Sequence, residues 1–209
     1  MLTSKIMSIK VFVSAIGTDS GKTLVSAILT RKWQASYWKP IQCGLPPDSG
    51  EISKLCGPGT TIFQETHFLK TPASPHFAAS QEGVDIKLSD FSLPETPGSL
   101  VVEGAGGLLV PINRTQTIAD LVIHLRLPLV LVVNHYLGSL NHSLLTIQEL
   151  KRRQISILGI VFNGIDFQDA ESIILESAQV PCLFRIQKWP EVNAEAIAAF
   201  CENLKLNAS

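Results

Sequence analysis

Short apolar runs alternate with longer segments of helical periodicity, and this alternation constrains the fold more than any other feature of the sequence. Six runs are predicted strands, and four of them are apolar almost throughout. Strands have this composition when helices cover both faces of a parallel sheet. The predicted strands are residues 9–14, 36–41, 99–103, 128–134, 157–163 and 182–186, and the predicted helices are residues 22–34, 118–125, 140–153, 169–179 and 194–203. This order predicts an α/β fold with a doubly wound, mostly parallel sheet.

Length and charge narrow the class of protein further. A chain of 209 residues suits one domain. We therefore expect residues 1–209 to form a single domain, with residues 1–8 as a candidate disordered N-terminal extension. Lys and Arg number 17 against 18 Asp and Glu, which leaves a net charge of −1. A near-neutral chain lacks the basic surface of a nucleic-acid or acidic-membrane binder, so neither is expected as a partner.

Cysteine usage and the lengths of the apolar runs bear on the compartment. The four cysteines have no C-x-x-C spacing, which favours a reducing compartment over a disulfide scaffold. The first ten residues have no apolar signal segment. Apolar runs reach only about eight residues, far short of the ~20 that span a bilayer. These features predict a soluble cytoplasmic protein.

Residues 42–97 differ from the rest of the chain. They are richer in Gly, Pro, Ser and Thr, and their apolar residues show weak periodicity. We expect long loops there with up to two helices. Long loops inside a compact domain usually carry function.

The segment GTDSGKT, residues 17–23, follows the first predicted strand and opens the first predicted helix. A strand, loop and helix joined by Gly-Lys-Thr is the layout of a phosphate-binding loop (P-loop). Its backbone N–H groups hold phosphates, Lys22 reaches the terminal phosphates and Thr23 offers a hydroxyl to Mg²⁺. The strict pattern has glycine where this chain has Ile16, so the loop is a variant. The flanking strand and helix argue against an ordinary turn, and we expect a P-loop NTPase-like domain.

Two further groups end predicted strands of the same sheet. Glu103 closes the strand 99–103 and is followed by Gly104, Ala105 and Gly106. An acid at the carboxyl end of such a strand is well placed to complete a Mg²⁺ site, because the strand ends converge on one crevice. The alternative is a glycine-rich turn with an exposed glutamate. Lys39 ends the second predicted strand and offers a cation for ligand charge rather than for packing.

Several segments together resemble the dethiobiotin synthetase family. They cover most of residues 11–164, and the EGAGG, SPH…QEG and LGSLNH stretches are more specific than the P-loop. The segments are VSAIGTDSGKT (13–23), WKPIQCG (38–44), TPASPHFAASQEG (71–83), LVVEGAGGLLVPI (100–112), LPLVLVV (127–133), LGSLNHSLLT (137–146) and LGIVFNG (158–164).

The resemblance implies an enzyme that converts ATP, CO₂ and 7,8-diaminopelargonate into dethiobiotin, ADP and phosphate. In the family, an amine of the substrate takes up CO₂ as a carbamate, whose oxygen attacks the γ-phosphate. The second amine then closes the ureido ring and expels phosphate. Such chemistry needs positioning and charge stabilisation more than a protein nucleophile. The resemblance thus predicts an ATP-dependent cyclo-ligase that forms carbon–nitrogen bonds and uses Mg²⁺.

The family's functional residues can be carried over by position. Lys22, Lys39 and Asp19 match catalytic residues, and Thr23 and Glu103 match Mg²⁺ ligands. For the other metal-binding acid, Glu51 is the first choice and Asp48 the second. Cys43 stands where the family has a substrate-contacting Ser or Thr, and a thiol is a poorer donor. The residues expected to contact the nucleotide and its metal are Asp19, Ser20, Gly21, Lys22, Thr23, Leu24, Glu103, Gly104, Ala105, Gly106, Asn163 and Gly164.

The resemblance also implies a shared active site. Asn163 matches the asparagine that contacts adenine, and residues 186–189 should border the base, although they differ from the usual ones. The segment 137–146 opens a predicted helix, whose N-terminal N–H groups favour anions. In the family this loop binds the substrate's tail carboxylate across a homodimer interface. We therefore expect a homodimer in which Gly138, Ser139, Leu140 and Asn141 hold that carboxylate.

Two alternatives share the fold branch. ATPase switches of the ParA and MinD kind have a signature lysine near the start of the loop, where this chain has Ala15 and Ile16. Amidoligases of the cobyrinate-synthase kind need a glutaminase domain, for which this chain has no room. His135 and His142 have no metal-like cluster of His, Cys or Asp around them, so we interpret each as a structural or surface residue. Nucleotide selectivity stays open.

Overall fold

The structure is a computed structural model, and it describes residues 8–165, 169–187, 189 and 191–206. Apart from Ser8, the expected N-terminal extension therefore lies outside the described residues. Within the described residues, seven strands form one sheet in the order β4-β2-β6-β1-β7-β8-β9. Every neighbouring pair in it is parallel. The strands are β1 (Lys10–Ala15), β2 (Ser36–Trp38), β4 (Ile62–Phe63), β6 (Leu100–Gly107), β7 (Leu129–Asn134), β8 (Ile157–Asn163) and β9 (Cys182–Ile186).

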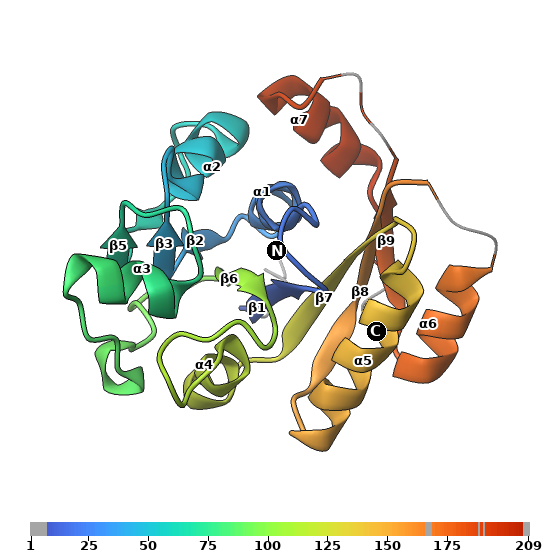
Figure 1. Cartoon of the computed structure of the whole chain (residues 1–209). Helices are drawn as coiled ribbons and strands as arrows, with labels where there is room; N and C mark the ends of the chain where they lie inside the picture. The colour runs from blue at the N-terminus through green and yellow to red at the C-terminus, as the bar shows by residue number, and fades with distance from the viewer. Residues whose placement is uncertain (1–7, 166–168, 188, 190, 207–209) are drawn as a thin grey trace.

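Helices cover both faces of this sheet, as Figure 1 shows. The helices α1 (Lys22–Lys32), α2 (Asp48–Cys56) and α7 (Ala194–Asn203) pack on one face. The other face is covered by α3 (Pro75–Glu82), α4 (Ile118–Leu125), α5 (Ser139–Arg152) and α6 (Ala170–Ala178). The predicted doubly wound α/β fold is confirmed.

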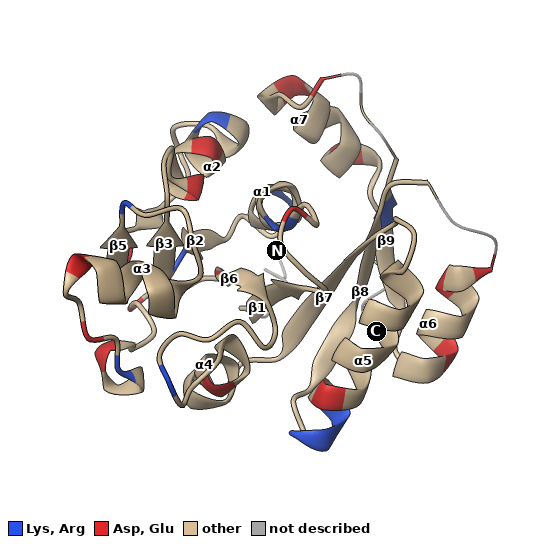
Figure 2. Ribbon diagram, viewed as in Figure 1, with Lys and Arg blue, Asp and Glu red and all other residues tan. Residues whose placement is uncertain are grey.

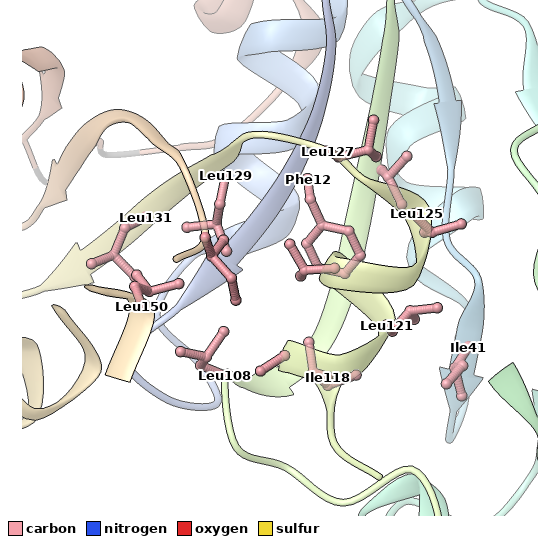
Figure 3. Close-up of a cluster of buried hydrophobic side chains, with 14 of the residues drawn as sticks. Phe12, Ile41, Leu108, Ile118, Leu121, Leu125, Leu127, Leu129, Leu131 and Leu150 are labelled. Carbon is pink, nitrogen blue, oxygen red and sulfur yellow. The ribbon is translucent and has the colours of Figure 1, made fainter. Parts of the chain in front are cut away.

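The alternation of side chains along each strand explains the continuous apolar runs. In β1, Val11 and Val13 pack in the core beneath α1, α2 and α7. Phe12, between them, points to the opposite face and lies among the leucines of α4 and β7 (Figure 3). Successive strand residues point to opposite faces, and both faces are buried here. The run Val11–Val13 is therefore continuously apolar, and the buried polar residue after it is the small Ser14.

The predicted strand 36–41 is wrong in its extent, because it is divided between two sheets. After β2 the chain passes through Lys39 and Pro40 into β3 (Ile41–Cys43), which pairs with β5 (His67–Leu69) in a separate two-stranded sheet. Proline has no N–H to donate to a ladder. The carbonyl of Pro40 instead accepts from the N–H groups of Thr66 and His67, both at 3.0 Å. Lys39 consequently lies at the carboxyl end of β2, where the two sheets separate.

The other elements match the prediction closely, with a few corrections. Strand β6 runs four residues past Glu103 to Gly107, so the alternative of a glycine-rich turn is wrong. The first predicted helix ends earlier, at Lys32, and α5 begins at Ser139. Residues 42–97 hold the two helices α2 and α3, and also the short strands β4 and β5 and a 3₁₀ turn over Leu88–Asp90.

Charge on the molecule is dispersed over its helices and loops. Figure 2 shows short red and blue segments spread along them, as expected for a chain with a net charge of −1. No helix in the described part of the chain combines the length and the apolar character needed to cross a membrane.

Candidate active site

The loop between β1 and α1 is shaped for close approach to a ligand. Asp19 and Gly21 have left-handed backbone conformations, with φ of 55° and 89°. A Cβ on Gly21 would lie 2.3 Å from Asn163 Nδ2, so only glycine fits there. The hydroxyl of Ser20 donates to the Gly17 carbonyl at 3.0 Å, which braces the loop. Ile16 is not among the described residues with positive φ, and the missing glycine of the strict motif is therefore tolerated.

A cavity of about 760 Å³ opens beside this loop. It brings together most of the predicted site, from segments far apart in the sequence. The lining residues are Thr18, Asp19, Ser20, Gly21, Lys22, Thr23, Lys39, Gln42, Cys43, Gly44, Leu45, Pro46, Asp48, Pro72, Ala73, Ser74, Pro75, Glu103, Ala105, Gly106 and Val110.

Glu103 is the buried acid of this cavity, with 1% of its surface exposed. Its Oε1 accepts from Thr23 Oγ1 at 3.0 Å and from Lys39 Nζ at 3.1 Å, and its Oε2 accepts from Tyr37 Oη at 2.9 Å. Burial raises the pKa of Glu103, but the Lys39 ammonium and the hydroxyl hydrogen bonds outweigh burial and hold the pKa below its usual value. Glu103 is therefore an ionised carboxylate inside the protein.

Lys39 is the buried cation that compensates this charge. Its ammonium pairs with Glu103 and also with Asp48. Burial lowers the pKa of Lys39, and the two carboxylates more than reverse that effect, so the net pKa is raised. Lys39 stays charged with its side chain 6% exposed, which identifies it as a structural ion-pair partner as well as a cavity residue.

Lys22 is the second lysine of the cavity and lies at the start of α1. Its ammonium donates to the Gly17 carbonyl at 3.1 Å, so the side chain folds back over the loop. Burial lowers its pKa, and the charge of Lys39 lowers it further, against the raising effect of Glu103. A lysine ammonium beside the backbone N–H groups of the loop suits the binding of a polyphosphate.

The two candidate acids on α2 have different positions. Asp48 begins the helix, lines the cavity and pairs with Lys39. Its backbone N–H donates to Gln42 Oε1 at 3.2 Å, which ties the start of α2 to the cavity wall. Glu51 is exposed and lies 4.0 Å from Lys54 on the same helix. The first choice, Glu51, is thus not brought to the cavity, whereas Asp48 is.

The donors present suit a magnesium ion. A hydroxyl and two carboxylates converge near the P-loop, all of them the hard oxygen ligands that Mg²⁺ prefers. The described residues contain no group of three or more His, Cys, Asp or Glu that could hold a metal by themselves. That fits Mg²⁺, which usually takes one or two protein carboxylates and completes its shell with water and phosphate.

Cys43 lines the cavity at the end of β3 and is half-buried. Burial raises the pKa of its thiol to about 11. The thiol is therefore protonated at neutral pH and is a weak donor rather than a nucleophile.

The expected base-binding residues lie at the other side of the P-loop. Asn163 ends β8, and its side-chain amide donates to the Ser20 carbonyl at 3.0 Å. The next residue, Gly164, donates its N–H to the Ile186 carbonyl at 2.8 Å. Trp189 packs against Phe200 of α7, and residue 188 lies outside the described residues. These groups border the loop but do not line the 760 Å³ cavity.

Other predicted contacts also lie away from the cavity. Leu24 and Gly104 do not line it. The backbone of Gly104 lies close to β1, since a Cβ at this position would be 2.7 Å from the ring of Phe12. That glycine therefore serves the packing of β6 on β1.

The start of α5 stands apart from the cavity. Gly138, Ser139, Leu140 and Asn141 line no part of it, and the Ser139 N–H donates to the Tyr136 carbonyl at 2.9 Å rather than being free. Asn141 is exposed. A second hollow of about 440 Å³ lies between this helix and the segment after β6, with His142 and Leu145 in its wall.

The two histidines have the positions expected of structural or surface residues, since the His135 side chain is buried and His142 is exposed. His135 Nε2 lies 3.1 Å from Glu171 Oε1, and the His135 ring stacks on Phe162. His142 Nδ1 lies 2.6 Å from Tyr136 Oη. The sequence prediction did not include Tyr37 or Gln42, which contact the site from inside the fold. Gln42 lies within the segment WKPIQCG and could have been proposed from it, whereas no local motif marks Tyr37.

Comparison with known proteins agrees with this geometry. The family model described as an AAA domain matches residues 10–196. A protein of Cytophaga hutchinsonii named ATP-dependent dethiobiotin synthetase is 48% identical over 198 residues, which cover 93% of this chain and 96% of that protein. The protein of the same name from Christiangramia forsetii is 40% identical over 197 residues, covering 93% and 95%.

Solved structures of other proteins share the fold. A ParA-family ATPase from Chlorobium tepidum superposes with a TM-score of 0.55 at 14% identity, covering 95% of this chain and 99% of its own. The septum site-determining protein MinD of Pyrococcus horikoshii, in complex with Mg-ADP, superposes with a TM-score of 0.55 at 13% identity, covering 94% and 96%. At these identities the likeness extends to the fold alone.

The two relatives named dethiobiotin synthetase are 40–48% identical to this chain over nearly their whole length. The ParA and MinD proteins share only its architecture. The chain therefore belongs to the dethiobiotin synthetase family.

Proposed function

We propose that this protein is an ATP-dependent dethiobiotin synthetase, a ligase of biotin synthesis that forms carbon–nitrogen bonds. The observation that carries the proposal is the cavity lined by Lys22 and Thr23 of the P-loop together with Lys39 and Glu103. The chain that forms it is 48% identical to a relative of that name. The substrates are ATP, CO₂ and 7,8-diaminopelargonate. The products are dethiobiotin, ADP and phosphate.

The reaction needs no protein nucleophile. One substrate amine adds to CO₂ and loses a proton, giving a carbamate. A carbamate oxygen attacks the γ-phosphorus, and the bond to the ADP oxygen breaks. The second amine then attacks the carbamate carbon, loses its proton and expels phosphate, which closes the ring. The protein contributes positioning and charge stabilisation, as is usual in phosphoryl transfer.

The cavity residues divide these tasks. Lys22 lies over the backbone donors of the loop and is placed to neutralise charge on the β- and γ-phosphates. Lys39 and Asp19 both line the cavity; Lys39 would stabilise the charge on the transferred group, and Asp19 would lie near the reacting amines. Cys43 contributes cavity wall and at most a weak hydrogen bond.

Magnesium would be held by Thr23 and Glu103, with Asp48 as the third group. Asp48 is preferred to Glu51 because it lines the cavity and Glu51 is exposed to solvent. When bound, the ion neutralises charge on the phosphate oxygens. Asn163 and Gly164 lie on the far side of the loop, where the adenine is expected.

Two copies of the chain are proposed to share each active site. The segment expected to bind the tail carboxylate, Gly138 to Asn141, does not line the cavity of its own chain. Exposed leucines surround its helix, with Leu137, Leu145 and Leu109 at 96%, 56% and 51% exposure. A second subunit that covers this face would bring its α5 N-terminus to the tail of the substrate. The free cysteines and the small-molecule substrates fit a cytoplasmic enzyme.

A direct assay tests the proposal. The protein is incubated with ATP, Mg²⁺, bicarbonate and diaminopelargonate, and the cyclic urea product is sought by mass spectrometry. The Lys22→Ala variant is the control, because loss of a charge-stabilising group should lower the rate ~10²-fold or more with unchanged circular dichroism. Absence of the urea with the unaltered protein would refute the proposal.

A further inference from the structure

Tyr37 contacts the candidate metal site from the hydrophobic side of the sheet. It lies on β2 and is fully buried, among the apolar side chains beneath α1 and α2. Strand β2 pairs with β6 so that Tyr37 is opposite Val101, two residues before Glu103. Residues two apart share a face of the sheet, and the phenol can therefore lean along the strand to reach Glu103.

The two oxygens of Glu103 face different surroundings. Oε1 is turned to the cavity, where Thr23 and Lys39 donate to it at 3.0 and 3.1 Å. Oε2 is turned to the core, where Tyr37 Oη donates to it at 2.9 Å. The carboxylate is thus held at both ends, and its plane is set by a group that does not touch the cavity.

The phenol is suited to a fixed donor role. Burial and the nearby Glu103 charge raise the pKa of Tyr37 well above its ordinary value, so the hydroxyl keeps its proton at any working pH. A buried donor behind a ligating carboxylate orients it and fixes which oxygen faces the metal. Without the phenol, Oε2 would lose the 2.9 Å hydrogen bond that holds it toward the core, and the carboxylate would be less firmly oriented.

We propose that Tyr37 is a positioning residue that holds Glu103 Oε1 toward the magnesium of the P-loop, an inference that rests on the proposed function. Tyr37 is not among the described residues that line the cavity, so it is placed to act on the site only through Glu103. Its effect is therefore specific to metal-dependent steps.

The test compares Tyr37→Phe with a matched control, Thr30→Val. Thr30 is a buried residue of α1 whose hydroxyl has no hydrogen-bond partner among the described residues. Calorimetry measures binding of a non-hydrolysable ATP analogue over a range of Mg²⁺ concentrations and again in EDTA. Tyr37→Phe should raise the Mg²⁺ concentration for half-maximal binding about 10-fold, as is typical when such a supporting hydrogen bond is lost. Affinity in EDTA should be unchanged, and Thr30→Val should match the unaltered protein.

A second measurement does not depend on Mg²⁺ or on how well Tyr37→Phe folds. The chain has two tyrosines, so Tyr136→Phe leaves Tyr37 as the only one. Its ultraviolet resonance Raman doublet should show a phenol that donates strongly. Adding Glu103→Gln should weaken that signature, because a neutral amide oxygen is a poorer acceptor than a carboxylate.

The possible outcomes distinguish the role of Tyr37 from the existence of the metal site. An unchanged Mg²⁺ requirement in folded Tyr37→Phe, or a doublet unaffected by Glu103→Gln, would overturn the role of Tyr37 while leaving the metal site intact. Analogue binding by the unaltered protein that does not respond to Mg²⁺ would contradict the proposed metal site, and the role of Tyr37 with it.

Discussion

At the scale of single residues, Lys39 combines a proposed role in ligand binding with a structural ion pair. The sequence suggested a lysine placed for ligand charge and not for packing. In the structure its ammonium also neutralises Glu103, whose side chain is fully buried. Removing one partner of a buried pair leaves an uncompensated charge, which is costly.

Lys39→Ala should therefore lose both activity and stability, the latter by less than the ~3–5 kcal/mol typical of a fully buried pair, because the cavity that Glu103 lines is large enough to hold water. Denaturant unfolding and the urea-product assay measure the two effects. The double variant Lys39→Ala with Glu103→Gln should recover much of the stability, because the amide carries no charge, and should stay inactive. A Lys39→Ala protein as stable as the unaltered one would show that the ion pair contributes little to the free energy of unfolding.

Glu103→Gln should weaken Mg²⁺-dependent turnover more than nucleotide binding in EDTA. The amide keeps the shape of the carboxylate but loses the charge that a hard cation prefers. Titrating activity with Mg²⁺ should move the half-maximal point to higher concentration for the variant. Superimposable titrations would mean that Glu103 acts only as a partner of Lys39.

At the scale of elements, a charged network joins α4 to α5. Arg153 donates to Glu149 at 2.5 Å and to Asp120 of α4 at 2.7 Å, and Arg152 donates to Glu149 at 2.6 Å. The hydrogen bonds from Arg152 and Arg153 lower the pKa of Glu149 to about 2 from its model-peptide value of 4.5. The stability that this network contributes to the packing of α4 and α5 therefore depends on pH.

A carboxyl whose pKa is lowered by folding stabilises the folded state. For Glu149 this contribution is complete above pH 4.5 and is lost as the pH falls through about 2. Glu149→Gln should lower Tm at pH 7 by about 1–3 °C, a small effect because the group is near the surface. The difference should shrink between pH 5 and pH 2. A difference in Tm that is the same at pH 7 and at pH 2 would exclude this linkage.

At the scale of the whole molecule, the proposed active site extends beyond one chain. The P-loop cavity and the start of α5 are separate surfaces of the same chain. The proposed contact with the tail carboxylate would therefore need a second copy of the chain. Light scattering of the active protein should report a dimer, and a fully active monomer would rule out the shared site.

Mixing two inactive variants tests the sharing itself. Lys22→Ala and Asn141→Asp damage different surfaces, so a heterodimer of the two retains one intact composite site. Partial activity should return on mixing. Lys22→Ala mixed with Lys39→Ala is the control, because both damage the P-loop cavity and no intact site can form. Equal rates in the two mixtures would argue against a site built from two chains.

Local sequence determined the elements and the phosphate loop. The central strands β1, β6, β7 and β8 each contain a run of mostly apolar residues, because burial on both faces of the sheet favours them. The two-residue edge strand β4 has no such run and was not predicted. The Gly-Lys-Thr turn is likewise local, since its backbone shape depends on a few adjacent residues such as Gly21. For the same reason most of the cavity residues on the P-loop could be named before the fold was known.

Tertiary structure decided which distant groups meet. Asp48 and Glu51 are three residues apart, and only the packing of Ile52 and Leu55 in the core sets which of them faces the cavity. Tyr37 reaches Glu103 through the register of β2 on β6, and no sequence pattern encodes that register. The break at Pro40 was equally hidden, because it depends on where β5 supplies a partner. Local propensity specifies elements, whereas the contacts of a site depend on long-range packing that only the folded chain defines.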